Sequence, residues 1–158
     1  MERQTIRIVK ESELTPKTKA VHPPYEYTKY EVTDPAECSQ CQVTIYEIPP
    51  YKSNYPYHYH IANTEVFYIL SGSGILTTPQ GEREVYPGDF IICPPDEKSA
   101  HKLTNQSGTE VLRYLDFDTC NDPDVIHYPD SKKTGVMVKG QKGAFYSDET
   151  KVTYYDGE

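Results

Sequence analysis

The sequence predicts a single domain of the all-β class, and three observations predict it. The chain has 158 residues, among them 13 Pro and 9 Gly, and both residue types interrupt helices. It also has 15 Tyr, an aromatic residue that favours strands. Between residues 42 and 118, short β-rich runs alternate with turn residues. A chain of this length can bury an ordinary hydrophobic core without disulfide bonds.

Each expected strand is rich in β-branched or aromatic residues and is bounded by turn residues such as Gly, Pro, Asn and Ser. The compact apolar run Phe90-Ile91-Ile92-Cys93, for example, ends at Pro94-Pro95. Short strands at this spacing are typical of a sandwich or a barrel, and we expect no helix of useful length. The expected strands are 42–48, 65–70, 75–78, 82–86, 90–93, 100–104 and 110–117.

The chain divides into three parts of different character. Residues 1–41 are mostly polar and read as an N-terminal arm; within them, 5–9 alternates like an edge strand or a mobile arm. Residues 42–118 hold the β core. Residues 119–158 are polar with scattered apolar positions, and we expect them to pack on the barrel as a C-terminal extension of the same domain.

Charge and hydropathy argue against two classes of partner. The net charge is −8, and no basic stripe of the kind that binds nucleic acid is visible. No run of 18 apolar residues is present, so we expect no membrane span. The N-terminus lacks the apolar stretch of a signal peptide, which makes the cytoplasm the expected location.

The four cysteines are too few for a disulfide scaffold in a chain of this length. Cys38 and Cys41 form one CxxC pair, whereas a zinc ribbon needs a second such pair. This pair leads into a strand-like run instead of opening a helix, so we expect unpaired thiols near the start of a strand.

The histidines carry the clearest chemical signal. His58 and His60 are two positions apart, so on a strand both imidazoles lie on one face. Glu65 follows at the start of an expected strand, and His101 lies on a later one. Three imidazoles and a carboxylate are suitable ligands for Zn, Fe, Mn, Ni, Co or Cu. The remaining histidines, His22 and His127, lie outside this pattern, and we expect them at the surface.

These residues resemble the two sequence motifs of the cupin family. The stretch from His58 to Glu65, followed by six residues and Gly72, is similar to the first motif, G-x5-H-x-H-x(3–4)-E-x6-G. The leading Gly of that motif falls at Lys52. The resemblance covers about residues 42–118, which is the whole expected β core.

The second motif, G-x5-P-x-G-x2-H-x3-N, resembles the stretch that begins at Gly88 and passes through Pro94 to His101 and Asn105. Its second Gly falls at Asp96, and His101 arrives two residues later than the motif predicts. A longer loop before His101 would still bring its imidazole to the same face.

The resemblance implies a double-stranded β-helix with one divalent metal ion inside the barrel. The ion would be Zn, Mn, Ni or Fe. Carried over residue by residue, it implies the ligands His58, His60, Glu65 and His101. Because many cupins are dimers, it also agrees with a homodimer. In support, the strand that places Glu65 and Phe67 inward presents Tyr68 to the outside, together with Val66 and Leu70, on a face too apolar for water.

Three further residues are predicted to line the substrate pocket: Phe67, Asn105 and Arg113. Phe67 shares the inward face with Glu65, and Asn105 shares it with His101. On the last expected strand, the face with Val111, Arg113, Leu115 and Phe117 is the more apolar, so we expect it inside. Arg113 would then anchor an anionic substrate or pair with a carboxylate such as Glu47.

The function predicted is that of a metal-dependent cupin acting on a small polar or anionic metabolite. The segment Tyr128-Pro129-Asp130-Ser131 in the tail resembles small cupins described as sugar phosphate isomerases. A phosphate site needs cations, and the candidates are Arg113, Lys98 and Lys102. A metal-dependent dioxygenase and a non-catalytic module that binds a small molecule or carbohydrate remain alternatives.

Overall fold

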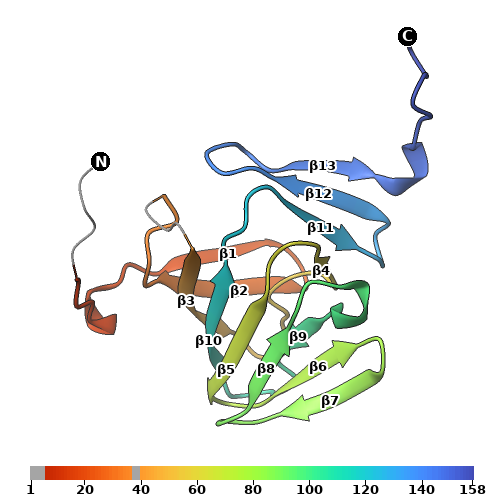
Figure 1. The fold of residues 1–158 in the computed structure, drawn as a ribbon. Helices are drawn as coiled ribbons and strands as arrows, with labels where there is room; N and C mark the ends of the chain where they lie inside the picture. Colours follow the sequence, from red (N-terminus) through yellow and green to blue (C-terminus); the bar gives the residue numbers. More distant parts are fainter. Residues whose placement is uncertain (1–5, 37–39) are drawn as a thin grey trace.

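The computed structural model describes residues 6–36 and 40–158, and antiparallel strands form most of its regular structure (Figure 1). Three short 3-10 turns complete it: η1 (Glu11–Glu13), η2 (Glu97–Ser99) and η3 (Asp148–Thr150). None of the helices within the described residues is long and apolar enough to cross a membrane. The all-β prediction is confirmed.

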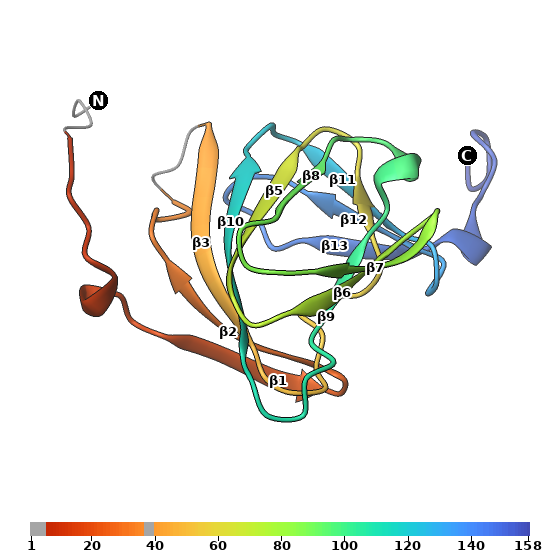
Figure 2. The same cartoon turned by 90° about the horizontal axis from the view of Figure 1, so that it is seen from below.

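The largest sheet has six strands and forms one wall of the barrel (Figure 2). Its strand order is β1 (Lys17–His22), β2 (Tyr25–Glu31), β3 (Cys41–Ile48), β10 (Leu112–Thr119), β5 (Glu65–Ser71) and β8 (Phe90–Cys93). Strand β10, the last strand of the core, lies between β3 and β5. It is therefore a neighbour of β5, which begins with Glu65 of the first motif.

Two smaller sheets complete the barrel. One contains β7 (Gly81–Val85), β6 (Gly74–Thr78) and β9 (Lys102–Thr104). The other, at the top of Figure 1, contains β13 (Ala144–Ser147), β12 (Lys133–Met137), β11 (Asp124–Tyr128) and β4 (Tyr59–His60). Through the β4–β11 pairing, the C-terminal residues lie against the strand that carries His60.

The core lies between the sheets and is built from the alternation seen in the sequence. Phe67 and Ile69 are buried on the inner face of β5, as predicted, while Tyr68 and Leu70 lie on its outer face. Side chains from the other strands meet them inside. Fully buried among the apolar residues are Ile48, Ile69, Leu103, Leu112 and Tyr114.

The predicted inner face of β10 is wrong. Leu112, Tyr114 and Asp116 are buried, whereas Phe117 is 39% exposed on the opposite face. The face with more apolar residues is not the inner one, because the inner face carries Asp116 and Asp118 toward the cavity. The outer face is instead part of an apolar sheet surface.

The terminal segments hold more regular structure than the sequence indicates. The alternating stretch 5–9 is not a strand over residues 6–9, and Thr5 lies outside the described residues. Residues 17–31 form β1 and β2, which join the main sheet. The polar C-terminal residues form β11, β12 and β13, although no strand was predicted there. Cys41 opens β3 as a free thiol, and Cys38 lies outside the described residues.

Candidate metal centre

His58 and His101 are brought together by the backbone itself. The two residues form an antiparallel β-bridge with His58 N–H donating to His101 O at 3.1 Å and His101 N–H donating to His58 O at 2.9 Å. Their rings are therefore neighbours, with centroids 4.7 Å apart. Residues 43 positions apart in the chain thus form one site.

The longer loop before His101 is accommodated by η2. The side chain of Asp96 accepts a hydrogen bond from the backbone N–H of Lys98 at 2.8 Å and caps this turn. The residue that replaces the motif's Gly thus has a local role. The turn absorbs the extra residues, and His101 reaches the same face as His58.

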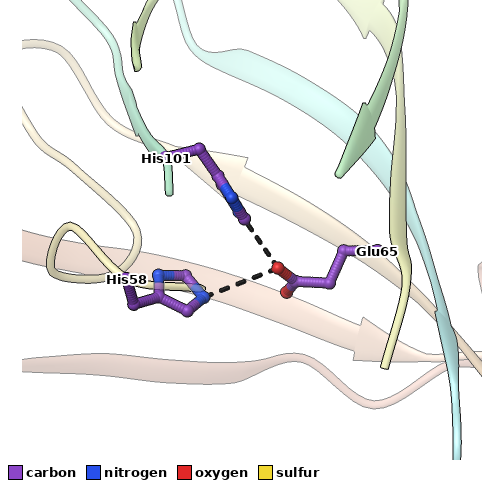
Figure 3. Close-up of side chains that lie close together, drawn as sticks. All are labelled: His58, Glu65 and His101. Atoms are coloured by element: carbon purple, nitrogen blue, oxygen red, sulfur yellow. Dashed lines mark ion pairs between the residues drawn. The ribbon is translucent and has the colours of Figure 1, made fainter. Parts of the chain in front are cut away.

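Three imidazoles face one oxygen of Glu65. The Nε2 atoms of His58, His60 and His101 lie 3.5, 3.4 and 3.0 Å from Glu65 Oε2. In Figure 3, the side chains of His58 and His101 both point toward one carboxylate oxygen of Glu65. The ligand atoms of His58, Glu65 and His101 lie within 4.8 Å of one another, and His60 stands beside this group. The structure thus brings all four predicted ligand residues together.

The other ring nitrogen of each imidazole fixes its orientation. Nδ1 of His58 lies 2.8 Å from Pro56 O, and Nδ1 of His101 lies 2.9 Å from Ser99 O. A carbonyl oxygen only accepts, so both Nδ1 atoms carry the proton, and in a neutral ring Nε2 presents a lone pair to the centre. Nδ1 of His60 lies 2.5 Å from Asp124 Oδ2, which orients that ring in the same way.

The donor set fits a divalent metal ion. Glu65 Oε2 and His101 Nε2 are buried and have no hydrogen-bond partner among the described residues. Lone pairs that face one another across such short distances need a positive charge between them, and imidazole nitrogens with a carboxylate suit Zn, Ni, Mn or Fe. These four residues would hold the ion.

Protons on the imidazoles could supply the positive charge in place of a metal ion. Burial alone would raise the pKa of Glu65, but the three imidazoles outweigh it and hold that pKa well below its usual range. Burial would likewise lower the pKa of His60, yet Asp124 and Glu65 together raise it to about 10. The centre therefore attracts cations, whether protons or metal ions.

The centre opens into a cavity of about 470 Å³. His58, His60 and Glu65 lie on its wall, and Tyr46, Tyr55 and Tyr128 add aromatic surface. The Tyr128 ring stacks near that of His58, with centroids 5.9 Å apart. A pocket of this size with a few polar groups is typical of a small-molecule site.

The cations of this cavity are residues that the sequence did not single out. Lys19 comes from β1, Lys29 from β2 and Lys133 from β12, and all three line the cavity. Lys29 Nζ lies 2.6 Å from Glu31, and Lys133 Nζ lies 4.8 Å from the centre of the Tyr128 ring. Lys98, by contrast, lines a separate surface groove, and Lys102 is not among the residues lining the metal-site cavity.

The three predicted pocket residues do not line this cavity. Phe67 is 2% exposed and packs behind the centre, with its ring centroid 5.4 Å from that of His101. Asn105 is fully buried, and its amide donates to Ile48 O at 2.8 Å and to Glu110 O at 2.7 Å. Its amide thus ties the end of β3 to the loop before β10.

Arg113 lies on the outer side of the main sheet, against the prediction that it is inside. Its Nε donates to Glu47 at 3.2 Å, and its guanidinium also pairs with Glu11. The alternative expectation for Arg113, a pairing with Glu47, is the one that the structure shows. His127, expected at the surface, is half-buried and contacts the Thr134 hydroxyl through Nδ1.

The comparisons with known proteins agree with this fold. The model of the cupin domain family matches residues 44–118. An uncharacterized protein of Methanocaldococcus jannaschii is 40% identical over 80 residues, which cover 51% of this chain and 59% of that protein. This chain thus spans less than two thirds of that curated relative.

Two solved structures match most of the chain. A candidate sugar phosphate isomerase from Acidithiobacillus ferrooxidans is 26% identical, with a TM-score of 0.79 over 90% of both chains. A cupin-superfamily protein from Silicibacter pomeroyi, named as a sugar phosphate isomerase, is 18% identical, with a TM-score of 0.81 over 95% of this chain and 98% of its own. Residues 44–118, which contain both motifs and the core strands of the barrel, match the cupin domain, and the chain shares its fold with these two solved structures.

Proposed function

We propose that this protein is a metal-dependent enzyme that acts on a small anionic metabolite, with a sugar phosphate as the substrate class. One observation carries the proposal: three lysines and the imidazole centre share one cavity in a chain whose net charge is −8. The likeness to the candidate sugar phosphate isomerase of Acidithiobacillus ferrooxidans supports the same class.

Different residues of the cavity would bind different parts of the substrate. Lys19, Lys29 and Lys133 would attract the anionic group of the substrate, since ammonium groups bind phosphate as point charges. The aromatic wall at Tyr128 would pack against the carbon skeleton and exclude water from one side. A metal held by the histidines and Glu65 would supply polarisation of a carbonyl or hold neighbouring oxygens.

The metal centre is tested by elemental analysis of protein purified without an affinity tag. We expect about one equivalent of a single metal that suits imidazole ligands, because the histidines and Glu65 offer one group of nitrogen and oxygen donors. The double variant His58→Ala/His60→Ala should lose that metal and keep its β-sheet circular dichroism. Retention of the metal by the variant would place the ion elsewhere.

The substrate class is tested with sugar phosphates and the matching free sugars, using NMR to follow interconversion and exchange of carbon-bound hydrogen with D₂O. We expect turnover of a phosphate and none of the free sugar. Lys29→Ala/Lys133→Ala should raise KM by about tenfold or more, which corresponds to about 1.4 kcal/mol of lost binding.

A matched pair outside the cavity, Lys98→Ala/Lys102→Ala, removes the same charge and should leave KM unchanged. Equal effects of the two double variants would refute the lysine cluster as the anion site.

The aromatic wall favours one alternative, a module that binds a carbohydrate or another small molecule without converting it. Tyr46, Tyr55 and Tyr128 line the same cavity, and aromatic faces pack well on ligands. Saturable binding of the sugar phosphate with no turnover in the metal-loaded protein would select this alternative. Iron in the elemental analysis, with oxygen consumption, would instead select the dioxygenase.

A further inference from the structure

Strand β10 brings two carboxylates into the cavity that the imidazole centre does not use. Asp116 and Asp118 are two positions apart, so both side chains lie on the inner face of the strand, and both line the cavity. The β10–β5 register sets Asp118 opposite Glu65. One carboxylate oxygen from each of Glu65, Asp116 and Asp118 lies within 4.8 Å of the other two.

These carboxylates are buried without the donors that such groups normally have. Asp116 is 5% exposed and Glu65 is 7% exposed. Among the described residues, Oδ1 of Asp116 and Oδ1 of Asp118 are buried and have no hydrogen-bond partner. Burying three carboxylates together is costly unless something positive accompanies them. That partner is either a proton or a metal cation.

We propose that Glu65, Asp116 and Asp118 form a second cation site, which takes a hard divalent cation of the Mg²⁺ or Mn²⁺ class beside the imidazole centre. Oxygen-only ligands select hard cations, whereas imidazoles select metals such as Zn or Ni. The two sites therefore differ in ligand chemistry as well as in position.

Glu65 belongs to both groups of ligands. All three contacts from the imidazoles go to its Oε2. A carboxylate has two oxygens and can join two cations, one through each. A cation at this place would balance the negative charge of the three neighbouring carboxylates.

Under the proposed function, the second cation would help to bind the substrate. Mg²⁺ and Mn²⁺ are commonly held by one or two carboxylates plus oxygens of a phosphate ligand. An anionic substrate in the lysine-lined cavity would then complete the coordination. This consequence rests on the proposed function, whereas the site itself rests only on the three carboxylates.

The experiment uses the full chain loaded with one equivalent of Zn²⁺, which fills the imidazole centre because zinc binds nitrogen ligands more tightly than manganese does. Mn²⁺ is then titrated at pH 8, and free Mn²⁺ is measured by its six-line EPR signal. We expect the zinc-loaded protein to take up about one further Mn²⁺ per chain. Asp116→Asn/Asp118→Asn should lose that uptake and keep its zinc.

A matched control removes two acidic charges at exposed positions of the chain. Glu82→Gln/Asp130→Asn changes the net charge equally and should bind Mn²⁺ like the parent protein. Asparagine has the shape of aspartate, and circular dichroism verifies that each variant is folded. The parent protein's own Mn²⁺ uptake tests the site independently of any variant.

Two results would overturn the second site. One is a zinc-loaded parent protein that takes up no Mn²⁺, which would assign a shared proton to the carboxylates. The other is equal Mn²⁺ uptake by the parent and by Asp116→Asn/Asp118→Asn. A chain that holds no zinc but still binds Mn²⁺ through these residues would overturn the imidazole centre alone, so the two failures are distinguishable.

Discussion

Asp124 shows how a residue outside both motifs acts on the candidate centre. Its Oδ2 lies 2.5 Å from His60 Nδ1, and its Oδ1 accepts from the backbone N–H of Ala62 at 3.0 Å. The carboxylate thus fixes both the ring of His60 and the chain that follows it. Nothing in the sequence marks this residue, because it lies 64 positions after His60.

We expect Asp124→Asn to lower zinc affinity by about 10- to 100-fold, the usual effect of removing a partner of a metal-binding histidine. An amide N–H facing Nδ1 favours the tautomer that carries its proton on Nε2, and that nitrogen then cannot bind a metal. Competition with a chromophoric chelator measures the affinity. Thr134→Val removes the equivalent partner of His127, away from the centre, and should leave zinc affinity unchanged. An unaltered affinity in Asp124→Asn would refute the role of Asp124.

Strand β10 shows how one element combines structure and chemistry. Its first inner positions, Leu112 and Tyr114, belong to the core, and its last ones, Asp116 and Asp118, line the cavity. The strand therefore stabilises the barrel at one end and places acidic groups near the centre at the other.

This acidic end predicts a pH-dependent stability in protein stripped of metal with EDTA. Burial and Glu65 raise the pKa of Asp118 from 3.8 to about 7, so its contribution to stability is complete below pH 3.8 and is lost as pH rises through 7. The raised pKa of His60, about 10, acts in the same direction above pH 6.5.

We expect the unfolding midpoint of the stripped protein to fall between pH 5 and pH 7.5. Asp118→Asn should reduce that fall by about 2–4 °C, because a loss of about 1 kcal/mol shifts the midpoint of a chain of this size by that amount. Calorimetric scans at both pH values measure the fall, with Asp130→Asn as the control expected to follow the parent protein. A fall of equal size in Asp118→Asn would contradict the assigned pKa.

The central elements could be predicted well from the sequence. The expected strand 42–48 is β3 (Cys41–Ile48), and 90–93 is β8 (Phe90–Cys93). Turn residues and alternation of apolar and polar residues are local signals, so they can be recognised in a single sequence. The spacing of His58 and His60 is equally local, and it located the candidate centre.

The rest depended on pairings between distant parts of the chain. Nothing in the sequence marks Lys19 and Lys133, and only the pairing of β1 with β2 and of β12 with β11 sets them around one cavity. The inner face of β10 could not be predicted from apolarity, because the acidic residue Asp116 is buried on it and lines the cavity. The rule that identifies core positions thus fails beside the candidate centre.

The outer surface of the main sheet is a property of the whole molecule. Opposite Val66 and Tyr68 on β5 lie Ile92 and Phe90 on β8, which are 67% and 69% exposed. Phe117 of β10 continues the same surface. An apolar patch of this kind usually marks an interface. We propose that two copies of the chain associate through this surface.

Light scattering coupled to size-exclusion chromatography should give about twice the chain mass of 18.1 kDa. We expect Tyr68→Asp to give a monomer, because dimerisation would bury an unpaired charge. Tyr155→Asp introduces the same charge at a position 77% exposed in the C-terminal tail and should remain dimeric. A dimeric Tyr68→Asp protein would exclude this surface as the interface.

The three lysines of the cavity come from β1, β2 and β12, toward the two ends of the chain, while the four candidate ligands come from the middle. Under the proposed function, the metal ligands and the residues that select the substrate thus lie in separate stretches of sequence. Mutations in β1, β2 or β12 would then alter what the cavity accepts without touching the imidazoles. In evolutionary terms, such a chain could change its substrate while its metal centre stayed the same.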